Sequence, residues 1–121
     1  MRETEKFRRD AEQASKRAGG RGEKAADEAL RAFFERSFPR LGEETASALF
    51  ASYLERKRRS PEAAMDWLGA VASVLLMDYD GTELAREDWV ELREALILDA
   101  ESLDMELLTY AMSLVVDHGA L

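Results

Sequence analysis

The sequence predicts an all-α protein: a single-domain bundle of about five helices around a central apolar helix at residues 61–79, plus an N-terminal helical arm. Three observations lead to this prediction. Apolar residues recur three and four positions apart in one segment after another. No run of alternating β-branched residues is bounded by turns. The 121 residues are 46% apolar and 35% charged, which is typical of a folded domain rather than of a disordered chain.

Residues 1–22 are predicted to form the arm and a glycine-rich hinge, and residues 23–121 the bundle. Phe7 is the only large apolar residue from Glu3 to Ala18, and alanines at helical spacing complete a thin stripe. Three glycines among residues 19–22 then disfavour a helix, by about 1 kcal/mol each relative to alanine. We therefore expect the arm to be marginal alone and to need a partner.

The next two helices are delimited by local signals. The first, at residues 23–37, stops at Phe38-Pro39 because a residue before proline disfavours the α region. The second begins after Gly42 and carries Leu49, Phe50 and Tyr53 on its buried face.

The central helix starts at Ser60-Pro61-Glu62, where serine can accept from free amides, proline suits the first turn and an acid suits the helix dipole. The following residues are apolar nearly all round, as expected of a helix in the middle of a bundle. We expect this helix to reach Tyr79, with Gly81 in a left-handed exit position.

Two more helices complete the bundle. One begins between Glu83 and Arg86, and Trp89 on its inner face is expected to meet Trp67 in or beside the core. The other is expected to be capped by Ser102 and to end near His118-Gly119. Its apolar stripe is wide and comprises Leu103, Leu107, Leu108, Ala111, Leu114 and Val115.

The net charge of −8 is divided unequally along the chain. Residues 1–60 hold 15 basic and 11 acidic side chains, and residues 61–121 hold 2 basic and 14 acidic ones. The halves therefore carry +4 and −12. Phosphate contacts need clustered Lys and Arg, so we expect a charge-guided partner of the second half to be basic.

Two charged groups are candidate partner-binding residues. Glu87, Glu91 and Glu94 share one helix face and indicate a docking surface for a basic protein, a mimic of nucleic-acid charge or an ordinary solvated face. Basic residues at the end of another helix indicate either phosphate binding or favourable contacts with a helix C-terminus. These basic residues are Arg56, Lys57, Arg58 and Arg59.

Composition also limits the chemistry. Without cysteine the chain has no thiolate nucleophile, and its single histidine, His118, is better explained as a helix cap than as a catalytic base. The loop at residues 78–82 places oxygen ligands as an EF-hand does, but Glu83 and Trp89 stand where that motif needs glycine and glutamate. We expect no catalytic residues, no metal and no cofactor.

The resulting hypothesis is a cytoplasmic, noncatalytic protein-interaction or regulatory module, with no secretory signal and no membrane-spanning segment. Its partner is expected to be a basic protein, or a second copy that pairs the +4 half with the −12 half in a homodimer. The alternative is a nucleic-acid-associated protein that uses the basic arm and residues 56–59. A small-molecule site between helices also stays open.

Overall fold

A computed structural model describes residues 2–121, and within this range it contains six α-helices and no strand. The predicted all-α class is therefore confirmed. A short 3-10 turn, η1 (Ala100–Ser102), joins the last two helices. The helices are α1 (Glu3–Gly19), α2 (Glu23–Ser37), α3 (Glu43–Lys57), α4 (Pro61–Leu75), α5 (Arg86–Leu98) and α6 (Met105–Asp117).

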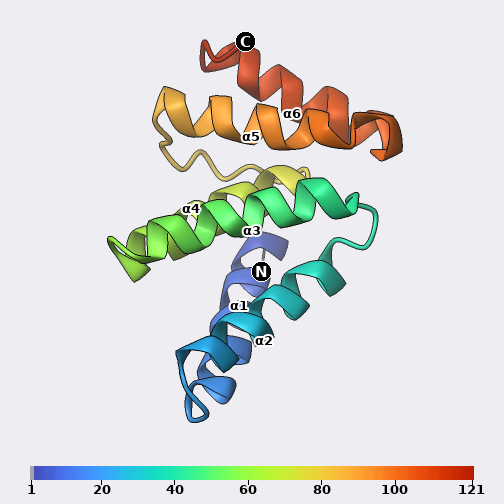
Figure 1. Cartoon of the computed structure of the whole chain (residues 1–121). Helices are drawn as coiled ribbons and strands as arrows, with labels where there is room; N and C mark the ends of the chain where they lie inside the picture. Colours follow the sequence, from blue (N-terminus) through green and yellow to red (C-terminus); the bar gives the residue numbers. More distant parts are fainter. Residues whose placement is uncertain (1) are drawn as a thin grey trace.

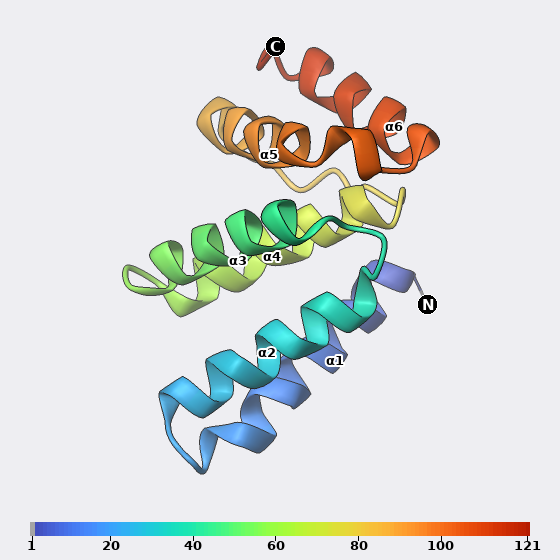
Figure 2. The same ribbon diagram turned by 45° about the vertical axis from the view of Figure 1, so that its right-hand side comes forward.

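The helices form three hairpins that are stacked as layers (Figures 1 and 2). Helices α1 and α2 make the first layer, α3 and α4 the middle one, and α5 and α6 the last. The first layer reaches the middle one through α1 and α4, and the last layer reaches it through α3 with α5 and α4 with α6. The middle hairpin is thus packed on both sides.

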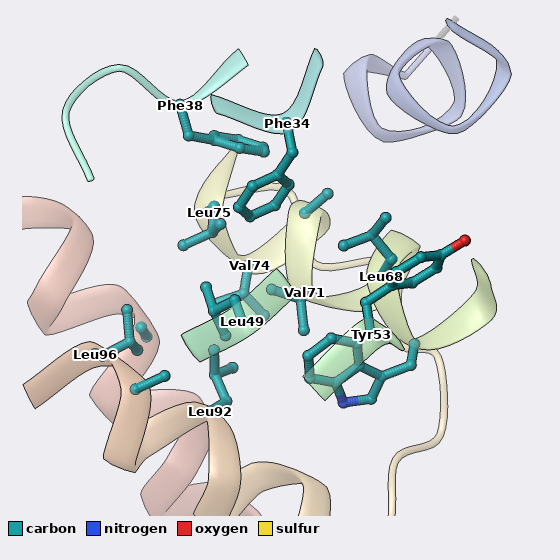
Figure 3. Packing of buried hydrophobic residues seen from close by; sticks show 14 of the residues in the cluster. Phe34, Phe38, Leu49, Tyr53, Leu68, Val71, Val74, Leu75, Leu92 and Leu96 are labelled. Atoms are coloured by element: carbon teal, nitrogen blue, oxygen red, sulfur yellow. The ribbon is translucent and has the colours of Figure 1, made fainter. Parts of the chain in front are cut away.

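Helix α4 provides much of the core because it touches α1, α3 and α6. Ten of its fifteen residues are buried. Figure 3 shows Leu68, Val71 and Val74 of α4 among side chains from α2, α3 and α5. The predicted start of the helix is confirmed, since the Ser60 hydroxyl accepts from the Ala63 amide at 3.2 Å.

The segment predicted as an arm is a helix that lies along α2 and α4. The Phe7 ring is buried, with its centroid 5.4 Å from that of Phe33 and 5.5 Å from that of Phe38. Ala11 is fully buried in the same core. The thin apolar stripe of α1 is therefore covered by α2 and α4 of the same chain.

Helix α4 ends four residues before the predicted position at Tyr79. Met77 adopts a left-handed backbone conformation with φ of 54°, and the Asp78 amide donates to the Ser73 carbonyl at 2.7 Å. This is the Schellman arrangement that closes a helix, here with methionine where glycine is usual. Gly81 has the expected positive φ, 81°, but it belongs to the loop that follows.

Two helix caps differ from simple sequence expectation. Ser102 lies in η1, and α6 is instead capped by Asp104, whose carboxylate accepts from the Glu106 and Leu107 amides. Helix α3 begins after Gly42, which has no capping side chain. The Asp99 carboxylate serves as the cap of α3 instead, accepting from the Thr45 amide at 2.7 Å.

Glycine is required at position 42 because Asp99 lies against it. A Cβ atom on Gly42 would be 2.2 Å from the Asp99 Cγ atom, far inside van der Waals contact. The small residue thus admits the carboxylate that caps α3 from the far end of α5.

The start of α1 is fixed to the loop after α4 by Asp78. The Arg2 guanidinium donates to the Asp78 carboxylate, with an N–O distance of 2.7 Å, and the Thr4 hydroxyl donates to its other oxygen at 3.2 Å. Hydrogen bonding from Arg2, supported by Thr4, holds the pKa of Asp78 below its ordinary value although burial acts in the opposite direction.

We expect this carboxylate to make stability dependent on acid pH. Because its folded-state pKa is depressed, Asp78 stabilises the fold above its unfolded pKa of about 3.9 and loses that contribution as the pH falls through the folded value. Urea unfolding from neutral to strongly acidic pH should show a constant difference between wild type and Asp78→Asn above about pH 5, narrowing below about pH 4. Arg2→Gln should give the same narrowing. A difference that is independent of pH would contradict this assignment.

None of the helices within residues 2–121 is long and apolar enough to cross a membrane.

Candidate functional site

Arg56 is the most connected of the four predicted basic residues. Its guanidinium donates to the carboxylates of Asp88, at 2.6 Å, and Glu91, and lies 4.2 Å from the centre of the Trp67 ring. Burial lowers the pKa of Arg56, but the hydrogen bonds and charges of Glu91 and Asp88 raise it by more, so the net shift is upward. Arg56 is therefore a structural cation that joins α3 to α5.

Lys57 points elsewhere. Its ammonium group is 2.5 Å from an Asp27 carboxylate oxygen and 3.3 Å from one of Glu23, which connects α3 to α2. Arg58 and Arg59 are the two cations of the cluster that stay exposed, with side chains 81% and 83% accessible and only long contacts to Glu55. The four residues do not form one basic surface.

The predicted acidic residues are divided in the same way. Glu91 accepts from the Ser52 hydroxyl at 3.0 Å as well as pairing with Arg56. Glu87 and Glu94 are exposed. The structure thus brings the basic and acidic candidates together through Arg56 and Glu91, and leaves two glutamates facing solvent.

Opposite charges of the two halves of the chain also meet within one molecule. Arg2 pairs with Asp78, and Arg8 with Asp66, in addition to the contacts of Arg56. These pairs use three cations of the N-terminal half and four acids of the C-terminal half that would otherwise be available to a second copy.

The aromatic residues and His118 serve the core and a helix end. Trp67 lies under Arg56, whereas Trp89 stacks on the His118 ring at 4.2 Å and meets the edge of Tyr79. The indoles are both buried, but their ring contacts are with these residues rather than with each other. The His118 Nδ1 atom is 2.8 Å from the Leu114 carbonyl oxygen, the geometry of a cap at the end of α6.

The described part of the chain holds no group of three or more His, Asp or Glu side chains placed to bind a metal ion. A hollow of about 610 Å³ lies beside Trp67 and is lined by charges of both signs, including Arg8, Arg59 and Asp88. Because both charge signs line this hollow, its charge favours neither an anionic nor a cationic ligand.

A surface that the sequence analysis did not single out lies on α6. Four apolar side chains at spacings of three and four follow one side of this helix, and they are Met105, Leu108, Met112 and Val116, hereafter the α6 stripe. Met105 is 73% exposed and Val116 52%, while Leu108 and Met112 are half-buried against the core. The stripe borders a shallow hollow of about 490 Å³ lined by α6 alone.

Comparison with protein-family models, with curated proteins and with solved structures finds no match to this chain.

The two ends of the stack differ in their outer surfaces. Every exposed side chain of α1 is charged or polar, whereas the last layer exposes the α6 stripe. In stacked helical hairpins the terminal units need a polar outer face, because no further layer covers them. Scattered apolar residues on a surface are ordinary. The four residues of the α6 stripe instead follow one side of a single helix, two of them exposed and two half-buried.

The charged side chains of α6 and its N-cap are acidic, and Asp117 lines the hollow beside the stripe. Asp104, Glu106 and Asp117 are exposed on the same helix, and no lysine or arginine occurs after Arg93. The sequence did carry a signal for this surface, since apolar residues cover more of α6 than one buried face requires. The pattern alone could not show which part of that arc the core would leave uncovered.

Proposed function

We propose that this protein is a noncatalytic protein-interaction module and that its partner, a basic protein, docks on the α6 stripe. The observation that carries the proposal is the apolar row on the last helix of the stack, whose end members Met105 and Val116 are exposed. Exposed apolar patches with a polar rim are typical of protein–protein contact sites.

The charges of the last layer support a basic partner. Glu87 and Glu94 are exposed on α5, and Asp117 of α6 lines the same hollow as the stripe. Complementary charge steers partners together and disfavours those of the same sign, so these acids favour a basic protein over an acidic one or a nucleic acid. Ion pairs within the chain also favour a different protein over a second copy, because Arg2, Arg8 and Arg56 of the N-terminal half already pair with acids of the C-terminal half of the same molecule.

Paired baits test the proposal. Purified wild-type protein and the variant Met105→Lys/Val116→Lys are incubated with native lysate at moderate salt, and retained proteins are quantified by mass spectrometry. Both changed residues are exposed, so the fold is expected to persist, which circular dichroism and thermal melting would verify. The matched control is Ala32→Lys/Ala51→Lys, which adds the same charge at exposed positions of α2 and α3.

We expect one or more basic proteins to be retained by wild type and by the control, and to be depleted by about tenfold with the stripe variant. The charge added to the stripe opposes a basic partner, and the lost apolar area removes the centre of the contact. Equal retention of the same proteins by all three baits would overturn the proposal.

A further inference from the structure

We infer that the segment seated on the α6 stripe is a basic amphipathic helix. This inference rests on the docking role proposed for α6 and deepens it by naming the chemistry of the bound segment. It follows from the shape of the stripe, from its methionines and from the sign of the charges beside it.

The shape of the stripe matches another helix. Its members are separated by three, four and four residues, so they form a straight row about 16 Å long on one side of α6. A helix lying alongside presents its own row at the same spacings, and rows of this kind interdigitate as ridges and grooves. Helix-in-groove recognition uses anchors at these intervals.

The side chains of the stripe suit an adaptable contact. Met105 and Met112 are two of its four members, and methionine is unbranched and polarisable, so it adjusts to differently shaped apolar partners. Such residues are frequent on surfaces that bind amphipathic helices.

The acidic charge of α6 favours a bound helix that is positively charged. Asp104, Glu106 and Asp117 are exposed on α6. The cations that reach this helix from other segments lie at its two ends. Arg40 is 3.8 Å from Asp104, and the Arg86 Nε atom donates to the Gly119 carbonyl at 2.8 Å. Lysines and arginines flanking the apolar row of the bound helix would meet acids along α6.

A second copy of α6 is a poorer occupant. In an antiparallel pair of α6 helices, Asp104 and Glu106 of one copy would lie near Asp117 of the other, and α6 itself contains no lysine or arginine to compensate. Like charges across an interface oppose association.

Three synthetic peptides of about 15 residues test the inference on the full chain. The first has a leucine row flanked by Lys and Arg, the second the same row flanked by Glu, and the third the composition of the first in an order that breaks the row. Binding of each labelled peptide is measured by fluorescence anisotropy at low salt and at about 0.15 M salt. Light scattering of the protein alone gives its mass over the same concentrations.

We expect the first peptide to bind about tenfold more tightly than the other two, and more weakly at the higher salt. Met105→Lys/Val116→Lys should weaken it by about tenfold, and Ala32→Lys/Ala51→Lys should not. Equal binding of the basic and acidic peptides would overturn the inference. A dimer that forms in wild type and is lost in the stripe variant would also overturn it in favour of a second copy.

These outcomes are distinct from failure of the proposed function. If the paired baits differ in what they retain while the basic peptide shows no preference, the stripe is a docking face for a segment of other chemistry and the inference alone is wrong. If the baits do not differ, the docking role itself is wrong.

Discussion

Replacing Trp67 by alanine is expected to lower the free energy of unfolding by about 3–5 kcal/mol, which is the range for removing a large aromatic side chain from a core. The indole is 3% exposed and belongs to the main apolar cluster. Its face also supports the Arg56 guanidinium, so truncation removes an apolar core residue and a cation–π contact together.

Urea denaturation followed by circular dichroism measures this effect without depending on the fluorescence of the residue removed. Leu98→Ala is the matched control, because Leu98 is 51% exposed on α5 and its truncation leaves no internal cavity. Its cost should be below about 1 kcal/mol. A loss for Trp67→Ala no larger than that of the control would show that the indole does not pack as described.

Replacing Arg56 by alanine is the second large expected effect, a loss of about 2 kcal/mol. The change leaves the carboxylates of Asp88 and Glu91 close together without their shared cation and uncovers Trp67. The expected loss of stability is well below that for breaking a buried ion pair, because these carboxylates are partly exposed and solvent screens their charge.

Two further variants distinguish loss of the positive charge from loss of the planar guanidinium, and Arg56 from its exposed neighbour. Arg56→Lys keeps the charge but loses the planar group that binds two carboxylates and stacks on the indole, so an intermediate loss is expected. Arg58→Ala removes an exposed neighbour and should cost less than about 0.5 kcal/mol. If the alanine variants at 56 and 58 behaved alike in urea denaturation, the structural role given to Arg56 would be wrong.

Most helix positions could be predicted because their signals are local. The cap at Ser60, the stop at Phe38-Pro39 and the glycines after α1 act within a few residues, and the helices begin and end there. The end of α4 was not predictable in this way. Its apolar residues continue past Leu75, and closure depends on a methionine in a backbone conformation that favours glycine.

Contacts between distant residues set the rest. Asp99 caps α3 although no feature of its own segment indicates that role, and the choice between Ser102 and Asp104 as a cap depends on where the turn before α6 ends. The charged candidates could be located from sequence, but which of them pair inside the molecule follows from the packing of the layers. Arg56 and Lys57 are neighbours in the chain and bind acids on different helices.

The caps and ion pairs that span many residues have a consequence for the chain during its synthesis. Helix α3 leaves the ribosome 54 residues before the carboxylate that caps its first turn, and Arg2 leaves it 76 residues before Asp78. Each hairpin can collapse on its own apolar face as it emerges, since its two helices are adjacent in the chain. The contacts of Asp78 with α1 and of Asp99 with α3 can form only later. The helices of the nascent protein can therefore form before the contacts that fix the starts of α1 and α3.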